Sequence, residues 1–277
     1  MTFYAVQNNG AALQAFALQQ SLKKLGAEPE LIRYFDRHNE SVAVKETRWA
    51  KLVRNPKIIV GILFHPVRYR KLRGKSQENA QAYNKFRQKY LNVSVEPYYE
   101  YEDLYEANKL YQGFIAGSDM VWTPIGQNLT AYFLQFADKE KRFSYSPSLT
   151  GCVSFSKENI HIINEYLQGM TMISCREQEG VDFIKKNVGL DAVLTLDPTL
   201  LFNKEEWRKE LSIESTKPNK PYILCYVFGG LPRHIAKEVN RIAEKYKMDV
   251  RLIPLLTKEY KFELDNDHNG PYGLVNL

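Results

Sequence analysis

Polar residues with binding chemistry occur at four points where a regular apolar pattern starts or stops. They are residues 8–10 (Asn-Asn-Gly), residues 117–119 (Gly-Ser-Asp), Arg176 and Asp197. In open parallel sheets, ligands bind beyond the carboxyl ends of the strands. Free N–H groups at a helix start favour an anion, a guanidinium can hold a phosphate or carboxylate, and Ser and Asp can bond sugar hydroxyls. These residues therefore indicate a site for an anionic or hydroxyl-rich ligand.

The first two segments each allow a structural alternative. Asn9 and Gly10 form either an anion site or a capped helix start that holds no ligand. Ser118 and Asp119 could bond sugar hydroxyls, and Trp122 could stack on a sugar ring. In the alternative, Asp119 caps the next turn and Trp122 packs in the core. The sequence leaves both pairs of alternatives open.

Arg176 directly follows an apolar segment, so its guanidinium could clamp a phosphate or a carboxylate. The alternative is an ion pair with Glu177, Asp119 or Asp197. Asp197 is followed by Pro198, a combination that favours a structural turn. The candidate substrate-binding residues are Asn9, Gly10, Ser118, Asp119, Trp122 and Arg176.

The sequence contains no motif for metal or nucleophile chemistry. No cluster of His, Cys and carboxylate residues has metal-ligand spacing, and there is neither a GxSxG elbow nor a phosphate loop. Cys152, Cys175 and Cys225 lie far apart and are odd in number. We expect buried reduced thiols, no metal and no cofactor.

The 277-residue chain is 44% hydrophobic and 25% charged, which is ordinary for a folded soluble protein. Its net charge of +6 is uneven, because residues 51–75 contain eight Lys or Arg residues and no acid. Such a segment attracts phosphates, acidic glycans or anionic lipid head groups, or is simply a solvated surface insertion. The aromatic motifs that a nucleic-acid-binding role would need are missing, so we expect no nucleic-acid partner.

Helices and strands alternate along the sequence, which predicts an α/β fold with a parallel sheet covered on both faces. An apolar stripe predicts a helix over 10–25 that ends at Gly26. The other predicted helices are 77–90, 101–108, 158–167, 177–186 and 233–247. The predicted strands are 2–6, 30–35, 112–116, 142–146, 172–175, 192–196, 222–228 and 249–255.

These elements divide into two Rossmann-like domains. The first covers residues 1–202 and carries the basic insertion 37–75. A linker rich in polar residues and proline follows at 203–220, and a partial second domain at 221–277. We expect the natural first strand to begin upstream of Thr2. We also expect the second domain to be cut short, because two strands are marginal alone.

Seven sequence blocks, taken in order and spacing, resemble the polysaccharide pyruvyl transferase family, over residues 3 to about 255. The first is Asn-Gly-Ala-Ala-Leu-Gln-Ala-Phe-Ala-Leu at 9–18, and the second is Phe-Arg-Gln-Lys-Tyr-Leu at 86–91. The others are FIAGSDMVW at 114–122, SYS at 144–146, ISCRE at 173–177, LDPTLL at 196–201 and YILCY at 222–226.

The resemblance implies a two-domain architecture similar to GT-B glycosyltransferases, the second domain being incomplete in this chain. It implies phosphoenolpyruvate as donor and a glycan or lipid-linked oligosaccharide as acceptor, with a pyruvate ketal and phosphate as products. Arg176 matches an arginine of the family and is expected to bind an anion. Asn9, Gly10, Ser118 and Asp119 match motifs on the cleft side. The family's C-terminal histidine has no match here, because His268 lies too early, so the catalytic acid is unassigned.

Two alternatives to a pyruvyl transferase stay open. One is a GT-B-like glycosyltransferase that uses a nucleotide sugar. The other is a truncated, non-catalytic paralogue that binds glycan or anion. The transferase hypothesis predicts a cytoplasmic protein of bacterial exopolysaccharide biosynthesis. It predicts peripheral contact with the inner face of the membrane where residues 51–75 meet anionic lipid.

Overall fold

The computed structural model of the chain describes residues 1–35, 80–213, 220–227 and 232–254. The insertion 37–75, its basic segment 51–75, and His268 lie outside the described residues. The chain forms two compact units. The first contains the described residues of 1–6, 10–35 and 90–203, and the second contains those of 7–9, 80–89 and 204–254.

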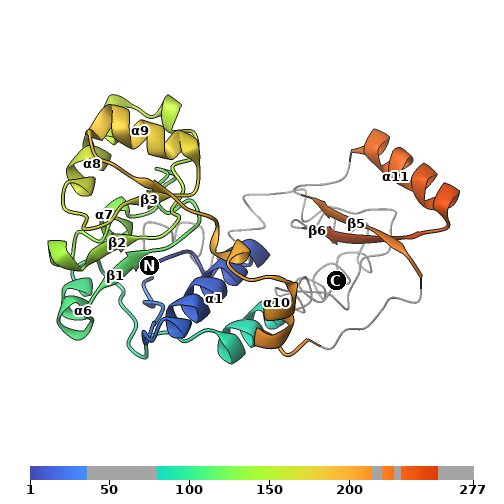
Figure 1. Ribbon diagram of the computed structural model, residues 1–277, viewed down its shortest axis with the longest axis horizontal. Helices are drawn as coiled ribbons and strands as arrows, with labels where there is room; N and C mark the ends of the chain where they lie inside the picture. Colours follow the sequence, from blue (N-terminus) through green and yellow to red (C-terminus); the bar gives the residue numbers. More distant parts are fainter. Residues whose placement is uncertain (36–79, 214–219, 228–231, 255–277) are drawn as a thin grey trace, which may run out of the picture. The chain divides into compact units, whose positions relative to one another are not determined.

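The first unit is built on four short parallel strands. They are β1 (Phe114–Ala116), β2 (Arg142–Ser144), β3 (Ser174–Cys175) and β4 (Val193–Leu194). β1 pairs with β2 and β3 pairs with β4, while a parallel bridge from Phe143 to Met172 joins the two pairs. The pairings and this bridge place the strands in the order β1-β2-β3-β4, of which Figure 1 labels the first three, and this confirms the predicted parallel α/β organisation.

The chain start extends this arrangement beyond β1. The Met1 amino group donates to the Ile115 carbonyl at 2.8 Å, and the Gly117 amide donates to the Met1 carbonyl at 2.8 Å. The strand predicted at 30–35 is reduced to two parallel bridges, Leu31 to Val93 and Tyr34 to Tyr98.

Helix α1 (Asn9–Lys24) confirms the predicted first helix, and Gly26 follows it in the left-handed conformation, with φ +87°. The predicted apolar stripe is only partly correct. Residues 11–17 are buried all round the helix, whereas Leu25 is 83% exposed. Small side chains explain the difference, because alanines on several sides of a helix allow close contact all around it. α1 is therefore a central helix in its first half and a surface helix in its second.

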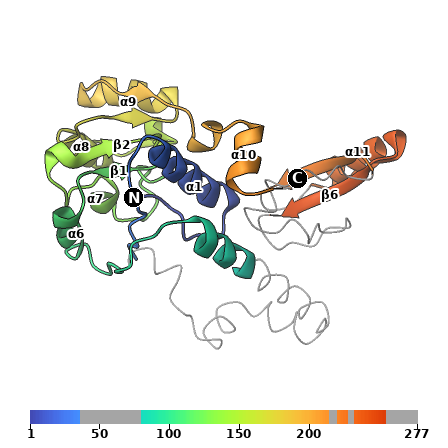
Figure 2. The same cartoon turned by 60° about the horizontal axis from the view of Figure 1, so that its bottom comes forward.

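The remaining helices of the first unit are α6 (Leu104–Leu110), α7 (Leu129–Tyr132), α8 (Lys157–Leu167), α9 (Gln178–Val188) and the 3₁₀ turns η1 (Lys139–Lys141), η2 (Cys152–Ser154) and η3 (Pro198–Leu200). Most of them connect successive strands, while α6 precedes β1 and η3 follows β4. Ser156 caps α8 by accepting from the Asn159 amide. α8 and α9 lie side by side (Figures 1 and 2). α7 and η1 lie between β1 and β2, η2 and α8 between β2 and β3, and α9 between β3 and β4, as parallel strands require.

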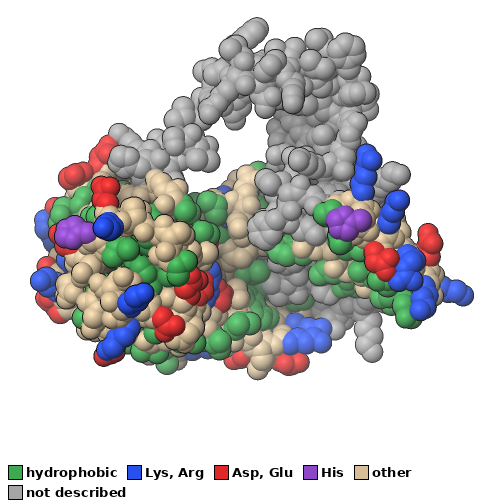
Figure 3. All heavy atoms as spheres, turned by 90° about the horizontal axis from the view of Figure 1, so that it is seen from above, with side chains coloured by type: hydrophobic (Ala, Val, Ile, Leu, Met, Phe, Trp, Pro, Cys, Tyr) green, Lys and Arg blue, Asp and Glu red, His purple; other side chains and the backbone are tan. Residues whose placement is uncertain are grey.

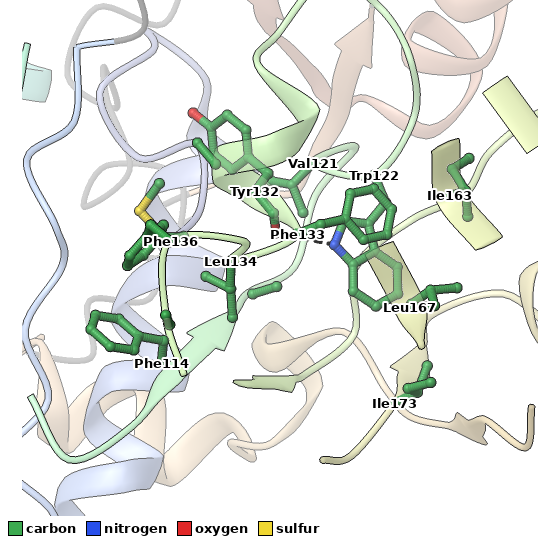
Figure 4. Close-up of a cluster of buried hydrophobic side chains, with 14 of the residues drawn as sticks. Phe114, Val121, Trp122, Tyr132, Phe133, Leu134, Phe136, Ile163, Leu167 and Ile173 are labelled. Atoms are coloured by element: carbon green, nitrogen blue, oxygen red, sulfur yellow. Dashed lines mark hydrogen bonds between the residues drawn. The ribbon is translucent and has the colours of Figure 1, made fainter. Parts of the chain in front are cut away.

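An aromatic core lies beneath the strand ends. Trp122 is fully buried, its ring stacks on Phe133 with 4.7 Å between ring centroids, and its indole N–H donates to the Tyr132 carbonyl at 3.2 Å (Figure 4). The side chains of Ile163 and Leu167 from α8 belong to the same core. Trp122 is thus a core residue. The sugar-stacking role considered for it is wrong for this structure, because neither face of its ring reaches solvent.

The second unit contains a complete β-α-β segment. Strand β5 (Tyr222–Val227) pairs in parallel with β6 (Asp249–Pro254), and α11 (Arg233–Tyr246) connects them. The helix α10 (Lys204–Glu210) and most of the helical residues 80–90 also belong to this unit. The predicted strands at 222–228 and 249–255 are confirmed over their described residues, 222–227 and 249–254, and the GT-B-like arrangement of two domains stays a prediction.

Two features of the described residues bear on possible partners. None of their helices is long and apolar enough to cross a membrane. Figure 3 shows that acidic and basic side chains are interspersed over the described surface on the face it presents, rather than gathered in a patch of one sign.

Cys152, Cys175 and Cys225 are buried free thiols, as predicted, and burial raises the pKa of Cys175 to about 12.

Candidate functional site

Three strand ends of the first unit bring Ser118, Arg176 and Asp197 into direct contact. Nη1 of Arg176 donates to Oδ2 of Asp197 at 2.9 Å and to Oγ of Ser118 at 3.2 Å. Oγ of Ser118 donates to the same Asp197 oxygen at 3.0 Å. Ser118 follows β1, Arg176 follows β3, and Asp197 follows β4, so the contact forms at the carboxyl edge of the sheet, where open α/β sheets bind ligands.

Arg176 is held on a second side by its neighbour. Its Nε donates to Oε1 of Glu177 at 3.0 Å. Burial lowers the pKa of Arg176, but the hydrogen bonds that it donates to Glu177 and Asp197 outweigh that effect and raise the pKa above its ordinary value. The ion pairs considered from the sequence, with Glu177 and Asp197, are both present. The side chain is nevertheless 28% exposed, and its Nη2 makes no hydrogen bond within the described part of the chain.

Asp197 combines a structural and a site role. Its Oδ1 accepts from the amide of Thr199 at 3.0 Å and from the Thr199 hydroxyl at 2.7 Å, which starts the turn η3. Its Oδ2 faces Arg176 and Ser118. Burial alone would raise the pKa of Asp197, but the hydrogen bonds from Thr199, Arg176 and Ser118 lower it below its ordinary value. The predicted turn is confirmed, and Asp197 also joins the cluster.

From the sequence, Asp197 was named as a possible ion-pair partner of Arg176 but not among the candidate substrate-binding residues. The signal was present, because Asp197 follows an apolar segment just as Arg176 does. The ends of neighbouring parallel strands meet at one edge of a sheet.

Asp119 occupies a different environment at the end of β1. Its backbone has φ +82°, a left-handed conformation that Asp tolerates better than most residues, and its Oδ1 accepts from the Met120 amide at 2.8 Å. Burial raises the pKa of Asp119, and the negative charge of Asp197 adds to that rise. The Met120 N–H and the charge of Arg176 act in the opposite direction but do not cancel it. The carboxyl group of Asp119 thus holds a proton more readily than that of Asp197, whose pKa is lowered.

A buried chain of hydrogen bonds from α1 and the chain start holds the backbone of Ser118. Nε2 of Gln14 donates to the Thr2 hydroxyl at 2.8 Å, which in turn donates to the Ser118 carbonyl at 2.7 Å. The absence of a side chain at Gly117 permits this approach, since a Cβ there would lie 3.1 Å from Cβ of Thr2. The motif glycine before Ser118 therefore has a packing reason.

The charge balance of the cluster limits what it can bind. The guanidinium of Arg176 faces the carboxyl groups of Asp119, Glu177 and Asp197. Carboxylate oxygens accept hydrogen bonds from hydroxyl groups, and the uncommitted Nη2 of Arg176 can donate to an anionic oxygen. The arrangement thus suits a ligand that carries both hydroxyls and an anionic group. No group of three side chains suited to holding a metal ion occurs among the described residues.

The helix-start candidates Asn9 and Gly10 have separate surroundings. The hydroxyl of Tyr83 donates to Oδ1 of Asn9 at 2.7 Å, and Asn9 is buried, whereas Gly10 is exposed. Tyr226, near the end of β5, also hydrogen-bonds Asn9. Asn9 therefore has a structural role in the second unit, and an anion at this helix start stays a prediction.

One family of proteins matches this chain over nearly its whole length. The family described as polysaccharide pyruvyl transferase matches residues 8–268. The match includes all four strand ends of the first unit and the β-α-β segment of the second. No curated protein and no solved structure gives a significant match.

Proposed function

Because the chain belongs to the polysaccharide pyruvyl transferase family, we propose that it moves the enolpyruvyl group of phosphoenolpyruvate to two hydroxyls of a cell-surface polysaccharide or its lipid-linked precursor. Both hydroxyl oxygens bond to the central carbon of the donor, and its bond to the phosphate oxygen breaks. The two acceptor hydroxyls lose two protons. The methylene carbon of the donor gains one proton, and the other leaves with phosphate. The product is a pyruvate ketal, and the reaction needs no cofactor.

The observation that carries this proposal is the hydrogen-bonded cluster at the carboxyl edge of the first unit. Nη2 of Arg176 would donate to the carboxylate or phosphate of the donor, and the Arg176–Asp197 ion pair fixes the direction in which it points. Ser118 is fully buried, so its hydroxyl would hold Asp197 and Arg176 in place without touching the ligand. Asp119, with its raised pKa, is suited to exchange a proton with an acceptor hydroxyl.

The location and partners of the protein follow from the same proposal. Phosphoenolpyruvate is a cytoplasmic metabolite, and a lipid-linked acceptor would lie at the inner face of the membrane. The basic segment 51–75, outside the described residues, would then contact anionic lipid head groups. Binding to vesicles with and without anionic lipid tests this part separately.

The test of the proposal is the release of phosphate from phosphoenolpyruvate in the presence of a panel of glycans and lipid-linked oligosaccharides. We expect release with at least one acceptor. For Arg176→Ala we expect kcat/KM to fall by about 100-fold or more, because the donor anion loses a charged hydrogen-bond partner. Arg176→Lys should recover only part of that loss, because lysine lacks the planar fork.

Arg241→Ala is the matched control. Arg241 is exposed on α11 and pairs with Glu238 of the same helix, so its loss should leave kcat/KM unchanged. Two results would count against the proposal. One is the absence of phosphate release over the whole panel. The other is a nucleotide sugar that raises the melting temperature when phosphoenolpyruvate does not, which would favour a glycosyltransferase.

A further inference from the structure

Three buried serines form a hydrogen-bonded network, here called the serine lattice, with the chain segments that carry Arg176 and Asp197. Ser144 ends β2, Ser146 lies two residues beyond it, and Ser174 begins β3. Each is 1% exposed or less. A buried hydroxyl is costly unless it is hydrogen-bonded, so the partners of these side chains show what they hold in place.

The first part of the lattice joins the ends of β2 and β3. The Ser174 amide donates to Oγ of Ser144 at 2.7 Å, and Oγ of Ser174 donates to the Ser144 carbonyl at 2.9 Å. The Ser146 amide donates to Oγ of Ser174 at 3.0 Å. Pro147 follows Ser146, and its carbonyl accepts from the Arg176 amide at 3.1 Å. The chain that carries Arg176 is therefore fixed to the segment that contains Ser146.

The second part of the lattice reaches across a strand. β2 and β4 are separated by β3, yet Oγ of Ser146 donates to the Leu196 carbonyl at 2.7 Å, with the Thr195 carbonyl at 3.2 Å. The Thr195 hydroxyl also donates to Oγ of Ser146, at 3.3 Å. Leu196 immediately precedes Asp197, so this one side chain fixes the backbone from which the Asp197 carboxylate projects.

The backbone of Ser146 is adapted to this reach. Its φ is +61°, in the left-handed region that serine rarely occupies. Such a conformation persists only where the surroundings enforce it, and it turns the chain after β2 toward the end of β4. The main-chain hydrogen bonds between β3 and β4 end where the Thr195 amide donates to the Cys175 carbonyl at 2.9 Å, and the hydroxyl of Ser146 holds the carbonyls of Thr195 and Leu196 at that end.

We propose that Ser146 is the positioning residue of the Arg176–Asp197 pair: its hydroxyl fixes the chain before Asp197, and its amide, through Ser174, fixes the chain before Arg176. Neither contact involves substrate, so Ser146 acts through the pair. A shift of about 1 Å in a binding group can lower the rate by a large factor. A residue that holds Arg176 and Asp197 in position can therefore affect catalysis without touching the substrate. Only its effect on catalysis rests on the proposed function, because the geometry of the pair can be measured without substrate.

The experiment compares Ser146→Ala with Ser148→Ala. Ser148 is a buried serine two residues away, and its hydroxyl bonds Oγ1 of Thr150 at 2.6 Å instead of the chain that carries Asp197. The first measurement follows the carboxyl carbon of Asp197 by NMR during a pH titration, with Asp197→Asn to assign the signal. We expect the midpoint to rise by about one pH unit in Ser146→Ala and to stay unchanged in Ser148→Ala, because only the first change loosens the ion pair.

The second measurement is the KM for phosphoenolpyruvate, which should rise by about tenfold in Ser146→Ala and stay within twofold in Ser148→Ala. Should Ser146→Ala fail to fold, Ser146→Gly removes the same hydroxyl and accepts the positive φ. Equal Asp197 midpoints in both variants and the unaltered protein would overturn the positioning role. If the Asp197 midpoint shifts in Ser146→Ala but the unaltered protein releases no phosphate with any acceptor, the positioning role is supported and the proposed transferase activity is refuted.

Discussion

Residues 117–122 contribute side chains to two regions of the first unit, and these regions are stabilised by different forces. Ser118 and Asp119 belong to the polar edge of the sheet, where directional hydrogen bonds hold each group. Trp122, three residues later, belongs to the aromatic core and is held by packing against Phe133. Substitutions in the core should therefore change the free energy of unfolding at every pH. Substitutions at the edge should change binding and the pH dependence of stability.

The largest expected effect is that of Trp122→Ala on stability. Removing a fully buried indole leaves a cavity, and such changes cost about 3–5 kcal/mol. Urea denaturation followed by circular dichroism measures this loss. Trp122→Phe keeps a ring against Phe133 and gives up the N–H bond to Tyr132, so its loss should be smaller. A loss below about 1 kcal/mol for the alanine variant would contradict the core assignment.

The next effect is that of Asp197→Asn, which should lower stability at pH 7 by about 1–2 kcal/mol, the scale of a charged hydrogen bond. The pKa of Asp197 is lowered in the folded protein, so its ionised form stabilises the fold above the ordinary value of 3.8. That contribution disappears as the pH falls through the lowered pKa. The difference between variant and unaltered protein should therefore shrink below pH 4. A constant difference from pH 7 to pH 3 would refute the ion-pair explanation.

The smallest effect, with the opposite sign, is expected for Asp119→Asn. The pKa of Asp119 is raised, so its stabilising contribution is complete below 3.8 and is lost as the pH rises through the raised pKa. Asparagine keeps an acceptor for the Met120 amide and tolerates the positive φ. We expect the variant to equal or exceed the unaltered protein by up to about 1 kcal/mol at pH 7. Chemical denaturation at pH 4 and pH 7 measures the change. A variant whose stability falls relative to that of the unaltered protein as the pH rises from 4 to 7 would contradict this prediction.

The regular elements could be predicted because their signals are local. The periodic apolar residues of α8 and the apolar segment of β5 lie within one element each, and both were placed within one or two residues. The burial of α1 was predicted less well, because it depends on what surrounds Ala12 and Ala17 in three dimensions.

The candidate site could be predicted only as separate parts. Ser118, Asp119 and Arg176 were recognisable from their positions after apolar segments. The contact of Ser118 with Asp197 joins residues 79 positions apart, and the sequence shows no sign of which partner Arg176 prefers. Ser146 belongs to the SYS block at 144–146, but the sequence did not indicate what its hydroxyl holds. Its importance comes from a bond that passes over a whole strand, which only the order of the strands makes visible.

The serine lattice has a consequence for hydrogen exchange. The amide protons of Ser146 and Ser174 are bonded to side-chain hydroxyls, whereas those of the neighbouring ladder are bonded to carbonyls. Their exchange with deuterium therefore depends on the opening of this polar edge, and the ladder amides depend on the opening of the sheet. These two protons are thus native probes of when the edge loosens, and they report it without a label or a ligand.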